Sequence, residues 1–415
     1  MPVLEKIYHD KLVIQELRQS VLGKYIDDFA LYLQELGYSK KKFRSRLTVI
    51  RKLSTWLTKN SIGLYDLNQE KINQFIKLRA RQSTAYLKRG DRKTLSYFID
   101  YLRRKKIIPQ LIPATPENEA IENIIQSYIK YLDEDKGLSA LTITRNKRFI
   151  YDFLYKNFGK NKFTPKKITQ SLILLYIIKF KERHAVRNLQ VMVSILRSFL
   201  RYLVMIGNLS VQLANCIPAM PSHRAANLPV FLVKSETKKL LKTCDRRTSN
   251  GRRNYAILLL LMRLGLRASE VLNLTLDNIN WDLGELEISG KGRKHRVLPL
   301  SNDIGKALTS YICYARPKCL HRQVFICSRA PHKGLGNPSS ISTIVRRALI
   351  AAGLKPQQMG AHLLRYTAAT ETLSKGATLF EIGELLGHRS IDTTAIYTKI
   401  DVVALRELAK PWPIK

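Results

Sequence analysis

The second half of the chain carries six polar side chains whose types suit an attack on a phosphodiester: Arg267, Lys291, His362, Arg365, His388 and Tyr397. A tyrosine phenolate can attack phosphorus and keep the energy of the broken bond in a phosphotyrosine, which a free hydroxyl can later reverse. Such a reaction also needs positive donors for the non-bridging oxygens, a base for the phenol proton and an acid for the leaving 5′-oxygen. The six residues include candidates for each of these tasks.

The expected local structure favours three of these residues as partners of a phosphate. Arg267 follows a glycine turn at the start of a helix, where its guanidinium and helix-terminal N–H groups can face one phosphate. Arg365 lies three residues after His362 on an expected helix, so the two side chains share a face. Lys291 stands between two glycines at an expected hairpin tip, where a flexible ammonium can enter a DNA groove and donate a proton.

Taken singly, each residue also has a purely structural interpretation. A lone histidine such as His362 is commonly a hydrogen-bonded structural residue, and Tyr397 can be a core aromatic. Arg267 can simply pair with Glu270, and Lys291 can be an exposed turn residue. It is the six together, in this order and at these intervals, that favour phosphodiester chemistry.

The charge balance indicates a polyanionic partner. The chain has 71 Lys and Arg against 32 Asp and Glu, which gives a net charge of +39. An excess of this size along the whole chain is typical of nucleic-acid binding, with an anionic membrane surface as the alternative. The candidate DNA-binding residues are Lys40, Lys41, Lys42, Arg44, Arg145, Lys147, Arg293 and Lys294.

Several other classes of protein are disfavoured. No apolar run reaches the roughly 18–20 residues of a membrane-spanning helix, and the N-terminus lacks the features of a signal peptide. The five cysteines are odd in number and lack C-x-x-C pairs, so we expect reduced thiols rather than a disulfide frame or a zinc site. We therefore expect a bacterial cytoplasmic, nucleoid-associated protein without a metal, cofactor, membrane partner or small-molecule substrate.

Apolar periodicity predicts a mainly α-helical chain. Residues 1–112 and 117–217 read as two helical DNA-binding domains, 218–229 as a linker, and 230–415 as a mostly helical domain with a small antiparallel sheet. In the first block, Ile26, Phe29, Leu31 and Leu33 mark one apolar stripe. A second stripe consists of Leu47, Ile50, Leu53, Trp56 and Leu57.

The two helical blocks look like a repeat. Tyr32–Ser39 is echoed by Tyr131–Ser139, Trp56–Asn60 by Phe153–Asn157, and Tyr101–Leu102 by Tyr202–Leu203, with a looser match at Ile72 and Ile168. The alternative is chance apolar matching between two bundles. We favour two tandem modules of four to five helices that clasp DNA.

The third block has a different pattern. Glu285–Ser289 and His295–Pro299 read as two strands of a hairpin whose tip is Gly290–Lys294. Helices are expected from Ser235, over 254–262, 302–315, 340–352, from His362, over 378–385 and over 402–410.

This third block resembles the catalytic domain of the tyrosine recombinases, the phage integrase and Xer-like family. The matching stretches are Gly265–Glu270, Gly290–Pro299, His362–Arg365, Leu386–His388 and Tyr397. Tyr366 stands where the family often has a second histidine, which puts only local packing in doubt. Residues 117–217 resemble the family's core-binding domain. The additional block at 1–112 makes the chain similar to the longer recombinases of bacterial transposable elements.

The resemblance implies a role for each of the six residues. Arg267 and Arg365 would hold the scissile phosphate, Lys291 would protonate the 5′-oxygen, and His362 would transfer protons. His388 would donate a hydrogen bond to the phosphate, Tyr397 would be the nucleophile, and Glu270 would support the helix of Arg267. The family acts as a tetramer on paired double-stranded DNA sites, either of one recombinase or of several related ones.

The resemblance also implies site-specific recombination in the integration, excision or transposition of a mobile element, without metal or ATP. Three alternatives remain: an enzyme that nicks and reseals DNA like a type IB topoisomerase, an inactive DNA-binding regulator, and a metal-dependent nuclease or transposase. We expect the tail after Tyr397, with Leu405, Leu408 and Trp412, to dock either on a neighbouring subunit or on its own domain.

Overall fold

The computed structural model describes most of the three sequence blocks. The described residues are 4, 5, 7, 8, 10–67, 69–81, 85–108, 118–159, 163–217, 230–289, 295–388 and 394, with backbone alone for 69, 80, 81 and 85–89. By compactness the chain divides into two units, one formed by residues 1–109 with 225–415 and the other by 110–224. Separate hydrophobic cores lie within residues 4–108, 121–217 and 232–364.

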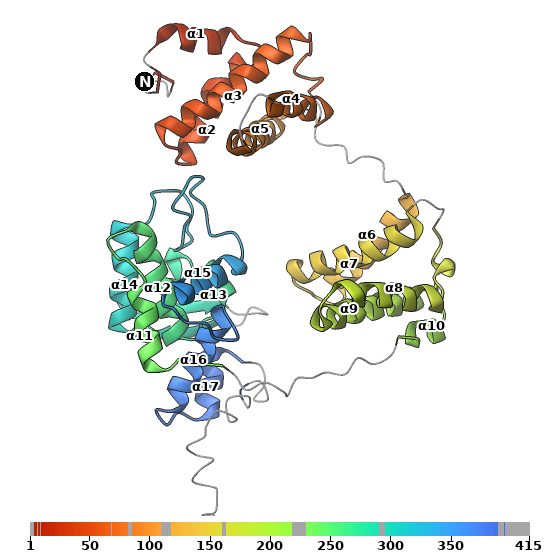
Figure 1. Ribbon diagram of the computed structural model, residues 1–415, viewed down its shortest axis with the longest axis vertical. Helices are drawn as coiled ribbons and strands as arrows, with labels where there is room; N and C mark the ends of the chain where they lie inside the picture. Colours follow the sequence, from red (N-terminus) through yellow and green to blue (C-terminus); the bar gives the residue numbers. More distant parts are fainter. Residues whose placement is uncertain are drawn as a thin grey trace, which may run out of the picture. The chain divides into compact units, whose positions relative to one another are not determined.

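The first bundle contains five α-helices (Figure 1). They are α1 (Lys11–Gln19), α2 (Ile26–Glu35), α3 (Lys40–Lys59), α4 (Gln69–Arg81) and α5 (Ala85–Arg104). The predicted apolar stripes fall on α2 and α3, and most of their members are buried. The prediction is wrong for Leu31, which is 48% exposed, because Ala30 faces the core in its place. Trp56 is half-buried and packs against Phe75.

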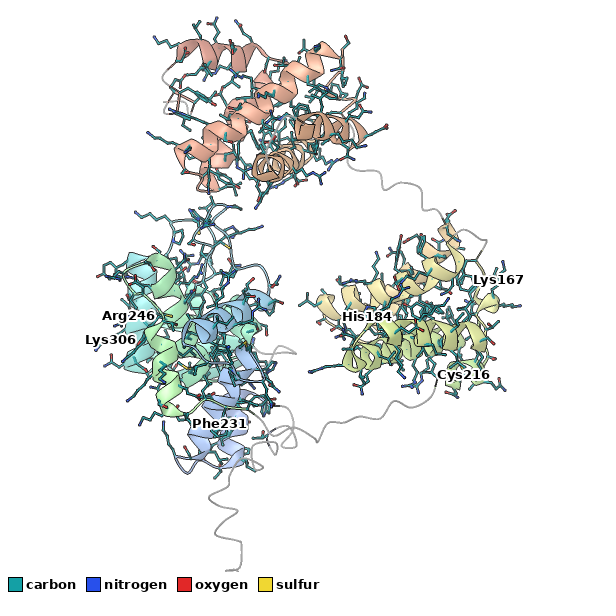
Figure 2. The ribbon with its side chains drawn as sticks, in the orientation of Figure 1. Lys167, His184, Cys216, Phe231, Arg246 and Lys306 are labelled. Carbon is teal, nitrogen blue, oxygen red and sulfur yellow. The ribbon has the colours of Figure 1, made fainter. Side chains whose placement is uncertain are left out.

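The second bundle repeats this arrangement. Its helices are α6 (Glu119–Glu134), α7 (Ala140–Phe158), α8 (Gln170–Arg183), α9 (Val186–Met205) and the short α10 (Val211–Asn215). Lys167 and Cys216 are labelled near its outer edge in Figure 2, which shows side chains filling the space between the helices. Helix α3 begins after Ser39 and α7 after Ser139, so Leu53 is in register with Phe153. The predicted match between Trp56 and Phe153 is therefore three residues out of register.

The C-terminal domain is mostly helical, as predicted. Its helices are α11 (Lys234–Lys242), α12 (Ser249–Arg263), α13 (Ala268–Asn273), α14 (Asn302–Tyr314), α15 (Pro338–Ala351), α16 (Ala361–Leu373) and α17 (Leu379–Leu386). Arg246 and Lys306 are exposed on its surface (Figure 2). The helix predicted to start at Arg267 is confirmed as the short α13, whose N-cap is Arg267. The expected helix at 402–410 lies outside the described residues.

One antiparallel sheet accompanies these helices. The hairpin of β2 (Glu285–Ser289) and β3 (His295–Pro299) is confirmed, with Leu286 opposite Leu298 and Ile288 opposite Arg296. The predicted tip at 290–294 lies outside the described residues. A two-residue strand, β1 (Ile279–Asn280), pairs with β2 and was not predicted because so short a strand has no readable alternation.

Helix α12 forms the centre of this domain. All residues from Ala256 to Met262 are buried, so the helix is apolar all round and must be enclosed by its neighbours. Helices α14 and α16 pack against it, and α17 packs in turn against α16. Helix α16 thus holds its residues in a rigid position relative to α12. Among the described residues, no helix is both long and apolar enough to cross a bilayer.

Candidate active site

The turn between α12 and α13 places Arg267. Gly265 has φ +59°, a left-handed conformation that favours glycine, and a Cβ there would lie 2.4 Å from Leu386 Cδ2. Arg267 is the N-cap residue of α13, and its backbone N–H donates to Glu270 Oε2 at 2.8 Å. This hydrogen bond ties the start of the helix to its first turn, so the position of the Arg267 side chain is fixed by the backbone beneath it.

Glu270 is a buried carboxylate shared by two arginines. Its side chain is 4% exposed and accepts from Arg267 Nη1 at 2.7 Å and from Arg296 Nη2 at 2.8 Å. Burial of a carboxylate is tolerated when it is paired and hydrogen-bonded in this way. The expected pairing of Arg267 with Glu270 is therefore present. The Arg267 side chain is still 34% exposed, so part of its guanidinium can contact another anion.

Arg365 joins two other segments to the same place. It is buried on α16, 5% exposed, and donates from Nη1 to the Gly265 carbonyl at 2.5 Å and from Nη2 to the Leu386 carbonyl at 2.6 Å. Arg267 Nη2 donates to the next carbonyl, that of Gly387, at 2.9 Å. Two guanidinium groups from residues almost 100 positions apart thus converge on adjacent carbonyls at the end of α17.

Gly387 provides the turn that makes this convergence possible. It ends α17 with φ +63° and ψ +52°, the left-handed conformation that commonly terminates helices. A Cβ at this position would lie 2.3 Å from Arg296 Nη1, so the absence of a side chain lets the Arg296 guanidinium lie against the turn. Arg296 Nε and Nη1 are buried without a hydrogen-bond partner among the described residues. The segment Leu386–His388 is therefore held by three arginines.

Replacing Gly387 should destabilise the protein more than replacing a glycine of similar φ that has no atoms near its Cβ position. We expect Gly387→Ala to lower the free energy of unfolding by at least about 2 kcal/mol, because Arg296 must leave Glu270 in addition to the backbone strain. Gly353→Ala is the matched control, since Gly353 has φ +71° but nothing within 4 Å of its Cβ position. It should cost only about 1 kcal/mol. Chemical denaturation measures both, and equal losses would contradict the packing of Arg296 on Gly387.

His388 follows this turn and is half-buried. Its Nδ1 lies 2.8 Å from Thr394 Oγ1, which is itself buried. Burial and then the charges of Arg365, Arg267 and Arg296 lower the pKa of His388 to about 4. The imidazole is therefore neutral at pH 7. When the Thr394 hydroxyl donates to Nδ1, the Nε2–H group remains as a hydrogen-bond donor.

This lowered pKa predicts a pH dependence of stability. In the unfolded chain the His388 pKa returns to about 6.5, so between pH 6.5 and 4 the unfolded chain binds a proton that the folded chain does not. Folding should weaken as the pH falls through this window. We expect His388→Gln to reduce the loss of stability between pH 7.5 and pH 5, measured by denaturation midpoints, whereas His321→Gln at an exposed loop position should not. An unchanged pH dependence in His388→Gln would be evidence against the lowered pKa.

The structure brings together three of the six candidates, Arg267, Arg365 and His388. His362 is exposed one turn before Arg365 on α16, with its ring centroid 6.4 Å from that of Tyr366. Lys291 and Tyr397, and the DNA-binding candidates Arg293 and Lys294, lie outside the described residues.

Arg296 was not predicted to belong to the site. Burial and then the positive charge of Arg267 lower its pKa, against the charge of Glu270, which raises it. The sequence feature that could have revealed Arg296 is its place on a half-buried strand, because a buried cation needs a nearby carboxylate.

The remaining DNA-binding candidates lie on α3 and α7. Lys40, Lys41, Lys42, Arg44 and Arg145 are exposed, and Lys147 is half-buried. Arg44 is partly engaged within its own bundle, since its Nε donates to the Ile7 carbonyl at 2.8 Å.

Comparisons with known proteins identify the family of this chain. The family model described as the phage integrase family matches residues 230–402. The putative integrase/recombinase y4rA of Sinorhizobium fredii is 35% identical over 389 residues, which are 94% of this chain and 94% of that protein. The chain belongs to the tyrosine recombinases of the phage integrase family. Tyrosine recombinase XerD of Listeria innocua is 30% identical over 70% of this recombinase and 98% of XerD.

The recombinase is also similar in fold to a solved structure. The structure of the XerH site-specific recombinase bound to palindromic difH substrate covers 73% of this chain and 99% of that one, with a TM-score of 0.54 and 20% sequence identity. The predicted family and the mainly α fold with a small antiparallel sheet are therefore confirmed. The enzyme is a site-specific DNA recombinase, as the family resemblance implied.

Proposed function

We propose that this recombinase cuts DNA through Tyr397 at the site formed by Arg267, Arg365 and His388. The Tyr397 oxygen attacks phosphorus, the bond to the 5′-oxygen breaks, and a 3′-phosphotyrosyl link and a free 5′-hydroxyl result. The phosphodiester is exchanged for another phosphodiester, so neither an oxidant nor a nucleotide is consumed. The observation that carries the proposal is the convergence of the Arg267 and Arg365 guanidinium groups on the turn at 386–387.

The arginines are suited to stabilise the charge that develops on the non-bridging oxygens. Each guanidinium is planar and permanently charged and has five N–H donors, so it can contact protein and phosphate oxygens together. Arg267 is the more open of the two, so we assign it the direct contact to one oxygen. Neutral His388 supplies a further hydrogen-bond donor from Nε2–H. A positive charge at this position would bind the substrate and the transition state equally, which does not speed the chemical step.

Proton transfer is assigned to the remaining candidates. Lys291, in the segment between β2 and β3, protonates the leaving 5′-oxygen, and His362 accepts the phenol proton or passes it on. His362 is suited to this role because it is exposed on the same helix that carries buried Arg365. Attack by the partner strand's 5′-hydroxyl then joins the exchanged strands, and a second round resolves the junction.

Separate hydrophobic cores and solved structures of similar fold support a proposed assembly. We propose three domains, 1–112, 117–217 and 230–415, that close on double-stranded DNA in the bacterial cytoplasm, two subunits to each site. Each has its own hydrophobic core, which supports independent folding. A solved structure of similar fold, with a TM-score of 0.52, is described as a lambda integrase dimer bound to a COC′ core site. The Tn1549 transposon integrase in complex with transposon right-end DNA has the same fold, with a TM-score of 0.51, and we propose a mobile element as the substrate here as well.

A nicked suicide duplex containing the recombination site tests the proposal. The wild-type protein should become covalently attached to the 3′ end beside the nick, and peptide mapping should place the DNA on Tyr397. The attachment should survive EDTA, which a metal-dependent nuclease would not tolerate. Strand exchange between two labelled duplexes should also be observed, whereas a nicking and resealing enzyme would relax supercoils without exchange. Absence of any covalent adduct would reject the assignment and favour an inactive DNA-binding protein.

A further inference from the structure

The two N-terminal bundles are copies of one module at the level of individual rings. The equivalent aromatic residues are Phe29 and Tyr128, Tyr32 and Tyr131, Phe98 and Phe199, and Tyr101 and Tyr202. Phe29 and Phe98 meet edge to face at 4.9 Å and 75°, and Tyr128 and Phe199 do so at 5.1 Å and 72°. The first pair joins α2 to α5, and the second pair joins α6 to α9. The repeat therefore extends beyond apolar periodicity to the geometry of the core.

The turns of the two bundles also correspond. Ser39 precedes α3 with φ −64° and ψ 151°, and Ser139 precedes α7 with φ −64° and ψ 146°. After α5, Lys106 adopts φ +55°, and after α9 the equivalent Gly207 adopts φ +73°. A lysine with positive φ costs about 1 kcal/mol or more, so the turn was kept although its glycine is absent. The register is 100 residues for α3 and α7 and 101 residues for α5 and α9.

The second copy has an open groove between α7 and α9. Its volume is about 440 Å³, and its polar lining includes Arg145, Asn146, Arg187, Ser194 and Ser198. Asn146 is 5% exposed, and its Oδ1 is a buried acceptor without a partner among the described residues. Arginine and asparagine are the side chains that pair with guanine and adenine edges. Arg145 and Arg187 are exposed in this groove and can reach a base edge, and Asn146 lines the same groove.

The first copy fills the equivalent position with its own side chains. The register pairs Tyr38 with Leu138, Arg46 with Asn146, Thr94 with Ile195 and Tyr97 with Ser198. The Arg46 guanidinium lies 4.1 Å from the Tyr38 ring centroid and 5.7 Å from that of Tyr97, and its Nη1 donates to Thr94 Oγ1 at 2.6 Å. At three of these four pairs the first copy has the larger or the charged side chain. Arg46 is held between the two tyrosine rings.

Exposed cations remain beside this closed position. Lys40, Lys41 and Lys42 occupy the first turn of α3, which contains no acidic residue, and Arg92 and Lys93 are exposed on α5. Lysines at a helix N-terminus oppose the helix dipole, so within the protein they are unfavourable by a few tenths of a kcal/mol each. Contact with a row of phosphates would make the electrostatic energy of these lysines favourable. The surface formed by these five cations is complementary to a DNA backbone.

We propose that residues 1–108, the first copy of the module at 118–217, have their groove closed by Arg46 and therefore hold DNA through phosphates alone. The second copy reads sequence through its open groove, and the first adds affinity without selecting bases. The inference rests on the proposed function only in that both copies act on the same DNA. A protein partner for the first copy is the alternative.

DNA binding by the full chain at several salt concentrations tests this division. Lys41→Ala/Lys42→Ala should weaken binding to a duplex selected from a random pool and to an unrelated duplex by the same factor. The slope of log affinity against log salt should become shallower by about 2. Lys52→Ala/Lys59→Ala is the matched control, with two exposed lysines nearer the other end of the same helix. It should leave both affinities and the slope nearly unchanged.

The second copy should respond differently. Asn146→Ala should reduce the preference for the selected duplex by roughly tenfold or more while changing binding to the unrelated duplex little. Unchanged affinities in the α3 double variant, or a change in its preference between duplexes, would overturn the proposal, and the first outcome would favour a protein partner. The wild-type protein should form the covalent adduct whether or not the two copies divide their roles, so failure of this inference is distinct from failure of the catalytic assignment.

Discussion

Tyr397→Phe is expected to abolish the covalent protein–DNA adduct, with a loss of roughly 10³-fold or more in the rate of strand cleavage. The change removes the oxygen that attacks phosphorus in the proposed mechanism. Binding to duplex DNA should be unaffected, because affinity depends mainly on phosphate contacts elsewhere. A nicked suicide duplex and a denaturing gel measure the adduct, and gel-shift titration measures binding.

Tyr366→Phe is the matched control for this substitution. Tyr366 lies on α16 next to buried Arg365 and is half-buried, so it tests whether any tyrosine hydroxyl close to the site is required. It should retain cleavage within a few-fold of wild type. If Tyr397→Phe formed the adduct at the wild-type rate, the nucleophile would have to be another residue. Loss of the adduct in Tyr366→Phe alone would point to that hydroxyl.

Glu270→Gln should lower both stability and cleavage. The substitution keeps the shape of the side chain but puts an amide donor against the Arg267 N–H, the Arg267 guanidinium or Arg296 Nη2, all of which now donate to the carboxylate. Breaking a buried ion pair by removing one partner costs about 3–5 kcal/mol. Arg267 would also lose the contact that orients it, so we expect cleavage at saturating DNA to fall by on the order of 10²-fold.

Glu287→Gln controls for the loss of a carboxylate in the same domain. Glu287 is an exposed residue of β2 whose partner is His295, and exposed pairs contribute little. Its midpoint of denaturation and its cleavage rate should remain close to wild type. A Glu270→Gln variant with wild-type stability and normal cleavage would show that the Arg267–Glu270–Arg296 arrangement does not position the site.

Local sequence patterns determined much of this protein. The 3.6-residue period of apolar residues predicted helices in all three sequence blocks, since the burial of one face depends on residues three and four apart. The alternation and turn residues around 285–299 predicted the β2–β3 hairpin for the same local reason. The order of Arg267, Lys291, His362, Arg365, His388 and Tyr397 was sufficient to indicate the family. The exposure of Leu31 was missed because Ala30 is too small to stand out as a core residue.

Only the tertiary structure decided how the site is held together. Arg365 donates to carbonyls 100 and 21 positions away, and Glu270 reaches Arg296 across 26 positions. The position of Arg46 between the rings of Tyr38 and Tyr97 also depends on tertiary packing, because it requires particular residues of α3 and α5 to face each other. No periodicity specifies such pairs. Burial is encoded by local spacing, whereas the partner of each buried charge is fixed only when distant segments pack.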